Sequence, residues 1–138
     1  MRVHQELLEI RTPGRGFVNI SGEVAEIVEK SGLLTALCTV FVQHTSASLL
    51  IQENADPAVR RDLASWIEEL APETRNWEHD DEGADDMPAH ARAALTSTSE
   101  VIPIVDGRLA LGTWQGLYLW EHRARPQIRR LVVHLQGE

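Results

Sequence analysis

Residues 33–44, with the sequence LLTALCTVFVQH, constrain the fold of this chain more than any other segment. The segment is rich in threonine, valine and phenylalanine and has no glycine or proline, a composition typical of β-strands. Its apolar residues follow one another almost without interruption, so the strand cannot be exposed to water on both faces. Other elements of the chain must therefore cover at least one face of a sheet built around it.

Further strands are predicted on both sides of this segment. Short runs rich in apolar and β-branched residues, bounded by turn residues, are typical of strands. Asp106-Gly107 lies between two such runs and is a strong signal for a two-residue hairpin turn. The predicted strands cover residues 4–10, 16–20, 46–52, 101–105, 108–112, 114–122 and 128–136.

Three helices are expected between the strands. The first begins at Ser21, whose hydroxyl is a candidate N-cap. The second begins at Asp56-Pro57, because aspartate caps a helix and proline fits its first position, and it ends at Pro72. Its apolar residues recur at helical spacing, which makes it amphipathic. The third covers roughly residues 87–95 and follows a polar loop.

Length and composition suit one globular domain. A chain of 138 residues buries about two thirds of its unfolded surface and needs no covalent staple. We expect an α+β fold: a single compact domain over residues 1–138, mostly antiparallel β-sheet with two or three helices packed on it. The one cysteine, Cys38, excludes an intrachain disulfide and, in its apolar run, favours a buried inert thiol.

The charge balance and hydropathy exclude some classes of partner. The net charge of −8 argues against binding to nucleic acid or to an anionic membrane. No segment approaches the roughly 18 consecutive apolar residues of a membrane span, and the first residues have no apolar run of signal-peptide length. We therefore expect a cytoplasmic protein.

Four of the six histidines lie in polar contexts, namely His44, His79, His90 and His122. Neutral imidazoles from three separate elements, His44, His79 and His90, would form a zinc-type site with an open position if they converge. No His-Glu-x-x-His motif or cysteine pair supports this prediction. The alternative is that each histidine makes separate hydrogen bonds at the surface or beside a ligand.

The acidic run offers a second kind of metal site. Asp80, Asp81, Glu82, Asp85 and Asp86 supply carboxylate oxygens, which Mg²⁺ prefers. The run lacks the Asp-x-Asp-x-Asp-Gly pattern of a calcium loop. The alternative is a solvated loop in which Asp86 caps the following helix.

Two further polar segments are candidates for ligand binding. Thr45, Ser46 and Ser48 follow His44, but without a Gly-x-Ser-x-Gly elbow they are expected to hydrogen-bond the backbone or a ligand phosphate. The segment GTWQG at residues 112–116 has glycines that allow a bulge or a close backbone approach. Its tryptophan and glutamine are either structural or ligand-binding.

Four blocks of the sequence together resemble the YjbQ family, whose members are also called secondary thiamine-phosphate synthases. They are QHTSASLLIQENADP at 43–57, HDDEGADDMPAH at 79–90, GTWQGLYLWEHR at 112–123 and LQGE at 135–138. The blocks occur in the family's order and cover nearly the whole chain. The resemblance implies a compact α+β fold, a homotrimer and a polar pocket near the subunit boundary that holds a metal.

The resemblance also implies roles for residues that match the family's motifs. His122 is a histidine that some branches of the family lack, so it is expected beside the site or on the substrate. The expected metal ligands are His44, His79 and His90; the expected catalytic residues are His44, Glu53, Gln115 and Glu121; and the expected substrate-binding residues are Thr45, Ser46, Asn54, Asp56, Trp114, His122 and Arg123.

The activity that the resemblance implies joins a hydroxymethylpyrimidine diphosphate to a thiazole phosphate. A divalent metal, zinc or magnesium, would offset charge on the leaving diphosphate, and Arg123 or Arg129 could clamp phosphate. One alternative is a metal-dependent hydrolase or lyase with Glu53 or Glu121 as general base. The other is a trimer that binds a metal or ligand without turnover.

Overall fold

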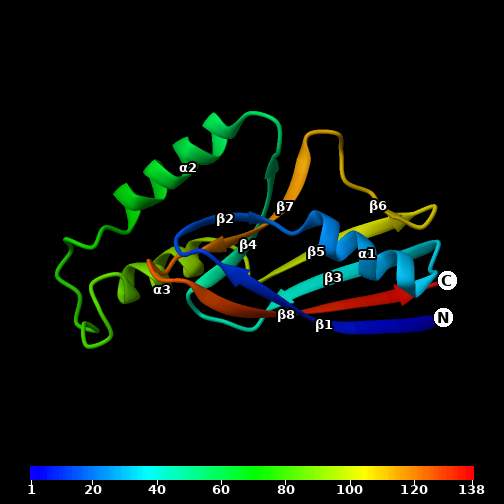
Figure 1. Cartoon of the computed structure of the whole chain (residues 1–138), viewed down its shortest axis with the longest axis horizontal. Helices are drawn as coiled ribbons and strands as arrows, with labels where there is room; N and C mark the ends of the chain where they lie inside the picture. The colour runs from blue at the N-terminus through cyan, green and yellow to red at the C-terminus, as the bar shows by residue number, and fades with distance from the viewer.

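The chain folds into two antiparallel sheets and three helices, seen in a computed structural model that describes all residues 1–138 (Figure 1). One sheet has five strands in the order β1-β8-β3-β5-β6, and the other has three in the order β2-β7-β4. The elements are β1 (Arg2–Thr12), β2 (Gly16–Asn19), α1 (Ser21–Ser31), β3 (Thr35–Val42), β4 (Ala47–Glu53), α2 (Pro57–Leu70), α3 (Asp86–Leu95), β5 (Ser99–Val105), β6 (Arg108–Leu109), β7 (Gln115–Glu121) and β8 (Gln127–Gly137). This arrangement confirms the predicted α+β class.

Strand β3, the apolar segment that constrains the fold, lies in the middle of the larger sheet between β8 and β5. Its alternate residues Cys38 and Val40 are buried, while Leu37 and Phe41 on the other face remain exposed. Neighbouring strands continue this exposed apolar surface, which we call the outer face. It includes Val3, Leu7, Leu37, Phe41, Val101 and Val105.

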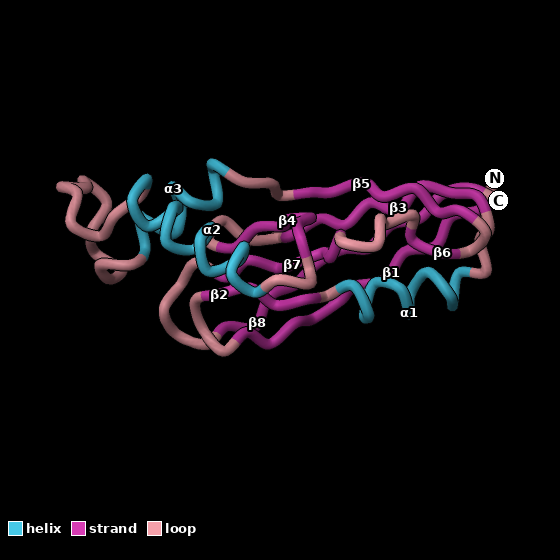
Figure 2. The backbone as a smooth tube through the Cα atoms, turned by 90° about the horizontal axis from the view of Figure 1, so that it is seen from above, coloured by secondary structure: helices cyan, strands magenta, loops and turns pink.

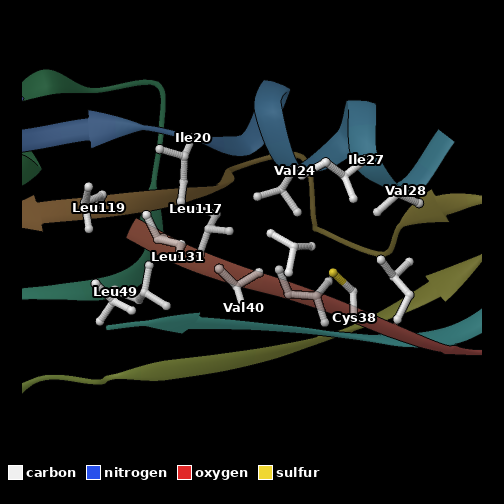
Figure 3. Close-up of a cluster of buried hydrophobic side chains, with 14 of the residues drawn as sticks. Ile20, Val24, Ile27, Val28, Cys38, Val40, Leu49, Leu117, Leu119 and Leu131 are labelled. Carbon is white, nitrogen blue, oxygen red and sulfur yellow. The ribbon is translucent and has the colours of Figure 1, made fainter. Parts of the chain in front are cut away.

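The hydrophobic core lies between the two sheets and α1 (Figure 3). Helix α1 contributes Val24 and Ile27, and the smaller sheet contributes Leu49, Leu117 and Leu119. Each fully buried side chain of this size stabilises the fold by about 1.5–3 kcal/mol relative to an exposed one. The core therefore gives the ends of β4, β7 and β8 fixed positions.

Helices α2 and α3 lie at the end of the molecule opposite the two termini (Figures 1 and 2). Asp56 caps α2 by accepting from Ala58 N at 2.9 Å, as its sequence predicts. The predicted apolar stripe is only partly covered, because Ile67 is buried whereas Trp66 and Leu70 are exposed. Helix α2 thus leaves most of its surface exposed, and Arg60 near its start connects it to β7 by donating from Nη1 to the hydroxyl of Tyr118 at 2.9 Å.

Local details differ from the predictions at two helix starts. Ser21 is the first residue of α1 and makes no cap; its hydroxyl instead accepts from Leu117 N at 2.8 Å and ties the helix to β7. Helix α3 begins at Asp86, one residue before the predicted start, so His90 lies one full turn into it. Asp86 does not cap the helix.

The predicted hairpin turn is confirmed, with φ values of 50° at Asp106 and 79° at Gly107. The strand after it is shorter than the predicted residues 108–112, because β6 spans only Arg108–Leu109. None of the three helices has both the length and the apolar character needed to cross a membrane.

Candidate functional site

Four side chains with metal-ligating atoms converge where the polar loop meets α3. His79 and Glu82 come from the loop, and Asp86 and His90 come from α3. Asp86 and His90 are four residues apart, which places them on the same face of the helix. One nitrogen or oxygen atom from each residue lies within 4.8 Å of those of the other three. We call these four residues the open cluster.

Asp86 is the centre of the open cluster. Its Oδ2 lies 2.7 Å from Nε2 of His79 and 3.3 Å from Nε2 of His90, and its Oδ1 accepts from Nη1 of Arg123 at 2.8 Å. Burial opposes ionisation, but the hydrogen bond with His79 and the nearby positive charges outweigh it and lower the pKa of Asp86. The cluster therefore presents an ionised carboxylate with a 3% exposed side chain.

The hydrogen bond at the other nitrogen of His90 fixes how this imidazole faces Asp86. Its Nδ1 lies 2.9 Å from the carbonyl oxygen of Thr45. A carbonyl can only accept, so Nδ1 carries the hydrogen and Nε2 of a neutral ring has a free lone pair. Two acceptors, Nε2 of His90 and Oδ2 of Asp86, then face each other at 3.3 Å. A metal ion or a proton between them would relieve their repulsion.

The donor set fits zinc better than magnesium. Two imidazole nitrogens and two carboxylate oxygens are common zinc ligands, whereas Mg²⁺ takes mostly oxygen. Ligands of a tetrahedral zinc ion lie about 3.4 Å apart, so the 4.8 Å cluster must contract to hold one. The side chain of His79 is 45% exposed and can move. Its hydrogen bond with Asp86 raises the pKa of His79.

Arg123 holds the loop in place instead of facing a free pocket. Its Nε donates to Asp85 at 2.9 Å, its Nη1 to Asp86 at 2.8 Å and its Nη2 to the carbonyl of Glu82 at 3.0 Å. The hydrogen bond with Asp85 is the largest cause that raises the pKa of Arg123. All three guanidinium nitrogens are therefore used within the protein, where a phosphate clamp was expected.

His44 lies outside the open cluster. Its Nε2 accepts from the backbone N–H of Arg130 at 2.8 Å, so Nδ1 carries the hydrogen in the neutral ring. Burial is the main cause that lowers the pKa of His44. With Thr45 and His90 it lines a cavity of about 260 Å³. The structure thus brings His79 and His90 together, and places His44 in the cavity on the other side of His90.

Glu121 belongs to a buried ion-pair network, where a general base was expected. It is paired with Nε of Arg129 at 2.7 Å and also with Nη2, and it accepts from Oγ1 of Thr12 at 2.7 Å. Nη2 of Arg129 also donates to Oγ of Ser46 at 2.9 Å. We call Glu121, Arg129, Thr12 and Ser46 the sealed cluster, because all four are buried.

His122 is buried beside the sealed cluster, where a substrate-binding role was expected. Its Nε2 lies 2.9 Å from Oγ of Ser48, and its Nδ1 has no hydrogen-bond partner. Burial, and then the positive charges of Arg92 and Arg129, lower the pKa of His122 to about 3. The ring is therefore neutral at physiological pH.

The remaining predicted residues lie at the far end of β4. Glu53 accepts from the N–H groups of Ala55 and Asp56 at 3.0 and 2.7 Å, and Asn54 donates to the carbonyl of Gln115 at 3.3 Å. Oε1 of Gln115 accepts from Gly112 N at 2.8 Å. Trp114 is exposed.

These residues build the turns that start α2 and β7. The seven residues of β4 separate them from His44 by about 20 Å. Within one chain, the predicted residues near Glu53 and those near His44 therefore lie too far apart to form a single site.

Sequence reasoning missed the central role of Asp86, which was assigned to a magnesium loop or a helix cap. The four-residue spacing of Asp86 and His90 on a helix was the available signal. It also missed Arg92, because the local sequence does not show that this arginine is buried or that it has no ion-pair partner.

Comparisons with known proteins agree with this fold. A sequence model of the family described as UPF0047 protein YjbQ-like matches residues 6–138. A UPF0047 protein of Synechocystis sp. is 59% identical over 99% of this chain and 94% of its own length. The UPF0047 protein YjbQ of Escherichia coli O157:H7 is 40% identical over 98% of this chain and 99% of its own.

Solved structures show the same architecture. A YbjQ-like protein of Sulfolobus solfataricus superimposes with a TM-score of 0.88 at 28% identity, covering 99% of this chain and 100% of that one. A YjbQ/UPF0047 family protein of Clostridium acetobutylicum gives a TM-score of 0.84 at 32% identity, covering 96% and 98%. The chain therefore belongs to the YjbQ-like UPF0047 family, as its four sequence blocks predict.

Proposed function

We propose that this chain is a divalent-metal-dependent enzyme for a small phosphorylated substrate, with the metal at the open cluster. The observation that carries the proposal is the geometry at His90. Its Nδ1 is bound to the carbonyl oxygen of Thr45, and its Nε2 faces the carboxylate of Asp86 at 3.3 Å. Metal-ligating histidines commonly donate their second ring nitrogen to a carbonyl in this way.

The first candidate reaction is the one that the family resemblance implies, a weak secondary thiamine-phosphate synthase. The bond between the pyrimidine methylene carbon and the diphosphate oxygen breaks, and the diphosphate leaves with the electron pair. The thiazole nitrogen supplies the pair for the new carbon–nitrogen bond, which gives thiamine phosphate and pyrophosphate. A bound divalent metal would offset the negative charge on the leaving diphosphate.

The residues of the chain have distinct tasks in this proposal. His79, Glu82, Asp86 and His90 hold the metal, and Arg123 keeps Asp86 and the loop oriented. His44 contributes a neutral Nδ1–H donor in the cavity that it shares with His90. His44 therefore binds the substrate and does not ligate the metal.

A metal-dependent hydrolase or lyase is the second candidate. It is favoured by Glu82, whose side chain is 61% exposed and lies 3.9 Å from His79. In this candidate Glu82 would act as the general base in place of a ligand, and a metal held by His79, Asp86 and His90 would activate a water. The expected bases do not offer this access, because Glu121 is buried and Glu53 is bonded to the backbone before α2. A trimer that binds the metal without turnover is the third candidate.

We also propose the homotrimer that the resemblance implies. Two features support association of copies: the apolar outer face of the larger sheet and the exposed Trp66 and Leu70 of α2. Exposed apolar patches of this kind are typical of protein interfaces. Association would also allow the Glu53–Asp56 turn of one chain to approach the open cluster of another.

Metal content and affinity of purified variants test the proposal. We expect about one zinc ion per chain in the wild type, with strong loss in His79→Ala, Asp86→Asn and His90→Ala. His44→Ala should keep the metal and lose turnover. His134→Ala, on the exposed side of β8, is the matched control. Folded wild-type protein that takes up neither zinc nor magnesium would contradict the metal site.

A substrate assay then separates the three candidates. Pyrophosphate released only when the thiazole phosphate is present identifies the transferase. Turnover of phosphorylated substrates without any acceptor identifies the hydrolase or lyase. Tight metal binding with no turnover over a broad substrate panel identifies the binding protein.

A further inference from the structure

Arg92 is a buried arginine without an ion-pair partner. It lies on α3 with 2% of its surface exposed. Its Nη2 donates to the carbonyl of Ala71 at 3.0 Å, its Nε has no partner, and it forms no ion pair. The other buried arginine, Arg129, is fully paired with Glu121. A buried charge without a counter-ion is costly, so Arg92 calls for an explanation that Arg129 does not.

Arg92 lines a cavity of about 280 Å³ where the end of α2 meets α3 and the β1–β2 turn. The other lining residues are Arg15, Glu68, Pro72 and Glu73. One water occupies about 30 Å³ of liquid, so the cavity has room for an oxyanion with several waters. Arg15 places a second guanidinium on the same cavity.

We propose that Arg92 and Arg15 form a binding site for a phosphate-type oxyanion in this cavity. Guanidinium groups bind phosphate with parallel N–H donors, and a partly desolvated guanidinium binds more strongly than an exposed one. The two arginines expected from the sequence to clamp phosphate, Arg123 and Arg129, already use their donors on carboxylates. Arg92, by contrast, lines a cavity, and of its guanidinium nitrogens only Nη2 is bonded within the protein.

The two glutamates of the cavity do not remove this attraction. Glu73 binds Arg15 at 3.0 Å with a side chain that is 41% exposed, and Glu68 is exposed without a partner. Water screens exposed carboxylates strongly, whereas the charge of Arg92 is buried. Glu73 therefore acts as an internal competitor, which an incoming oxyanion replaces on Arg15.

The oxyanion site does not need the metal. Arg92 lies two residues after His90, which is about 200° around α3 and thus on a different face. If the proposed transferase function holds, this site would bind a phosphate of one substrate away from the metal; that link alone rests on the proposed function. The binding test below is made without metal, so the two proposals stand or fall separately.

Calorimetric titration of the full-length protein in EDTA tests the site with inorganic phosphate and pyrophosphate. Acetate is titrated as a comparison, because it carries a carboxylate in place of a phosphate. We expect phosphate and pyrophosphate to bind at about 1 mM or tighter, and acetate to bind more weakly. Arg92→Met should weaken pyrophosphate binding by about tenfold or more, and Arg15→Gln by less. Glu73→Gln should tighten it. Arg61→Gln, which removes an exposed charge from α2, should leave it unchanged.

Absence of phosphate and pyrophosphate binding to the wild type would overturn the proposal, as would equal affinity of the wild type and a folded Arg92→Met variant. Thermal unfolding of each variant checks folding, because Arg92→Met also loses the bond to Ala71. If that variant does not fold, Arg15→Gln and Glu73→Gln decide the question. They must change the affinity in opposite directions, and a change in the same direction, or none, refutes the site.

Discussion

The sealed cluster around Glu121 and the open cluster around Asp86 each centre on a buried carboxylate that is paired with an arginine. They are joined through Arg123, whose backbone N–H donates to Glu121 at 3.1 Å while its side chain binds Asp86. In the sealed cluster the other two side chains, those of Thr12 and Ser46, are buried. In the open cluster the further partners are histidines, one of them 45% exposed. The difference is that Glu121 is enclosed by the protein, whereas Asp86 faces partly exposed side chains, which supports the proposal of a metal at the open cluster.

The largest expected effect is that of Glu121→Ala, which removes the carboxylate of the sealed cluster. The variant leaves Arg129 buried without a counter-ion, so the free energy of unfolding should fall by about 3–5 kcal/mol. Urea denaturation measures the change. The control is Glu9→Ala, which removes a half-exposed partner of Arg130 and should cost less than about 1 kcal/mol. Equal effects of the two variants would contradict the comparison.

The next effect is a pH dependence at His122, which borders the sealed cluster. Its pKa of about 3 in the folded protein lies below the ordinary value of 6.5, so between these values the unfolded chain binds more protons. The contribution of His122 to stability should therefore rise with pH in this window by up to about 1.4 kcal/mol per unit and be constant above it. Urea midpoints across the window measure the slope. His122→Gln should reduce the slope, and an unchanged slope would count against the assignment.

Removing the charge of Asp86 tests the open cluster. Asp86→Asn keeps the shape of the side chain but loses the carboxylate that faces both histidines, so zinc affinity should fall by about 10–100-fold. A competition titration with a zinc-binding dye measures it. Asp80→Asn changes the same loop outside the four ligand residues and serves as the control. If both variants bind zinc like the wild type, the open cluster is not the metal site.

The smallest expected effect is that of Thr12→Val, which weakens the sealed cluster without touching the open cluster. Thr12→Val removes the 2.7 Å hydrogen bond to Glu121 and the bond from Gln127 N, while it leaves the shape of the side chain nearly unchanged. The free energy of unfolding should fall by about 1 kcal/mol, with no change in zinc affinity. Thermal unfolding and the same dye competition measure both quantities. A change in zinc affinity would show that the two clusters are not separate.

Features set by neighbouring residues could be predicted from the sequence. The Asp106-Gly107 turn depends on two adjacent conformations, and the Asp56 cap depends on a bond to a residue two positions away. The strand around Cys38 was recognisable from its almost uninterrupted run of apolar and β-branched residues. These local and periodic signals were sufficient for the fold class.

The site depended on contacts that no local pattern encodes. The structure places His44 outside the open cluster, where the backbone N–H of Arg130, far along the chain, donates to its Nε2. Glu121 was expected to act as a base because its sequence does not show that Arg129 and Thr12 enclose it. Only Asp86 and His90, one helical turn apart, had a spacing from which their meeting could have been derived.

The small buried surface of α2 has a consequence for how the molecule opens. A helix of about 12–15 residues is marginally stable by itself in water, and α2, with 14 residues, buries only Ile67. In a single chain, its amides should therefore exchange with deuterium through local opening, ahead of those of β3 and β8 in the core. Since α2 leads directly into the loop of the open cluster, its unwinding would lengthen the tether that carries His79 and Glu82.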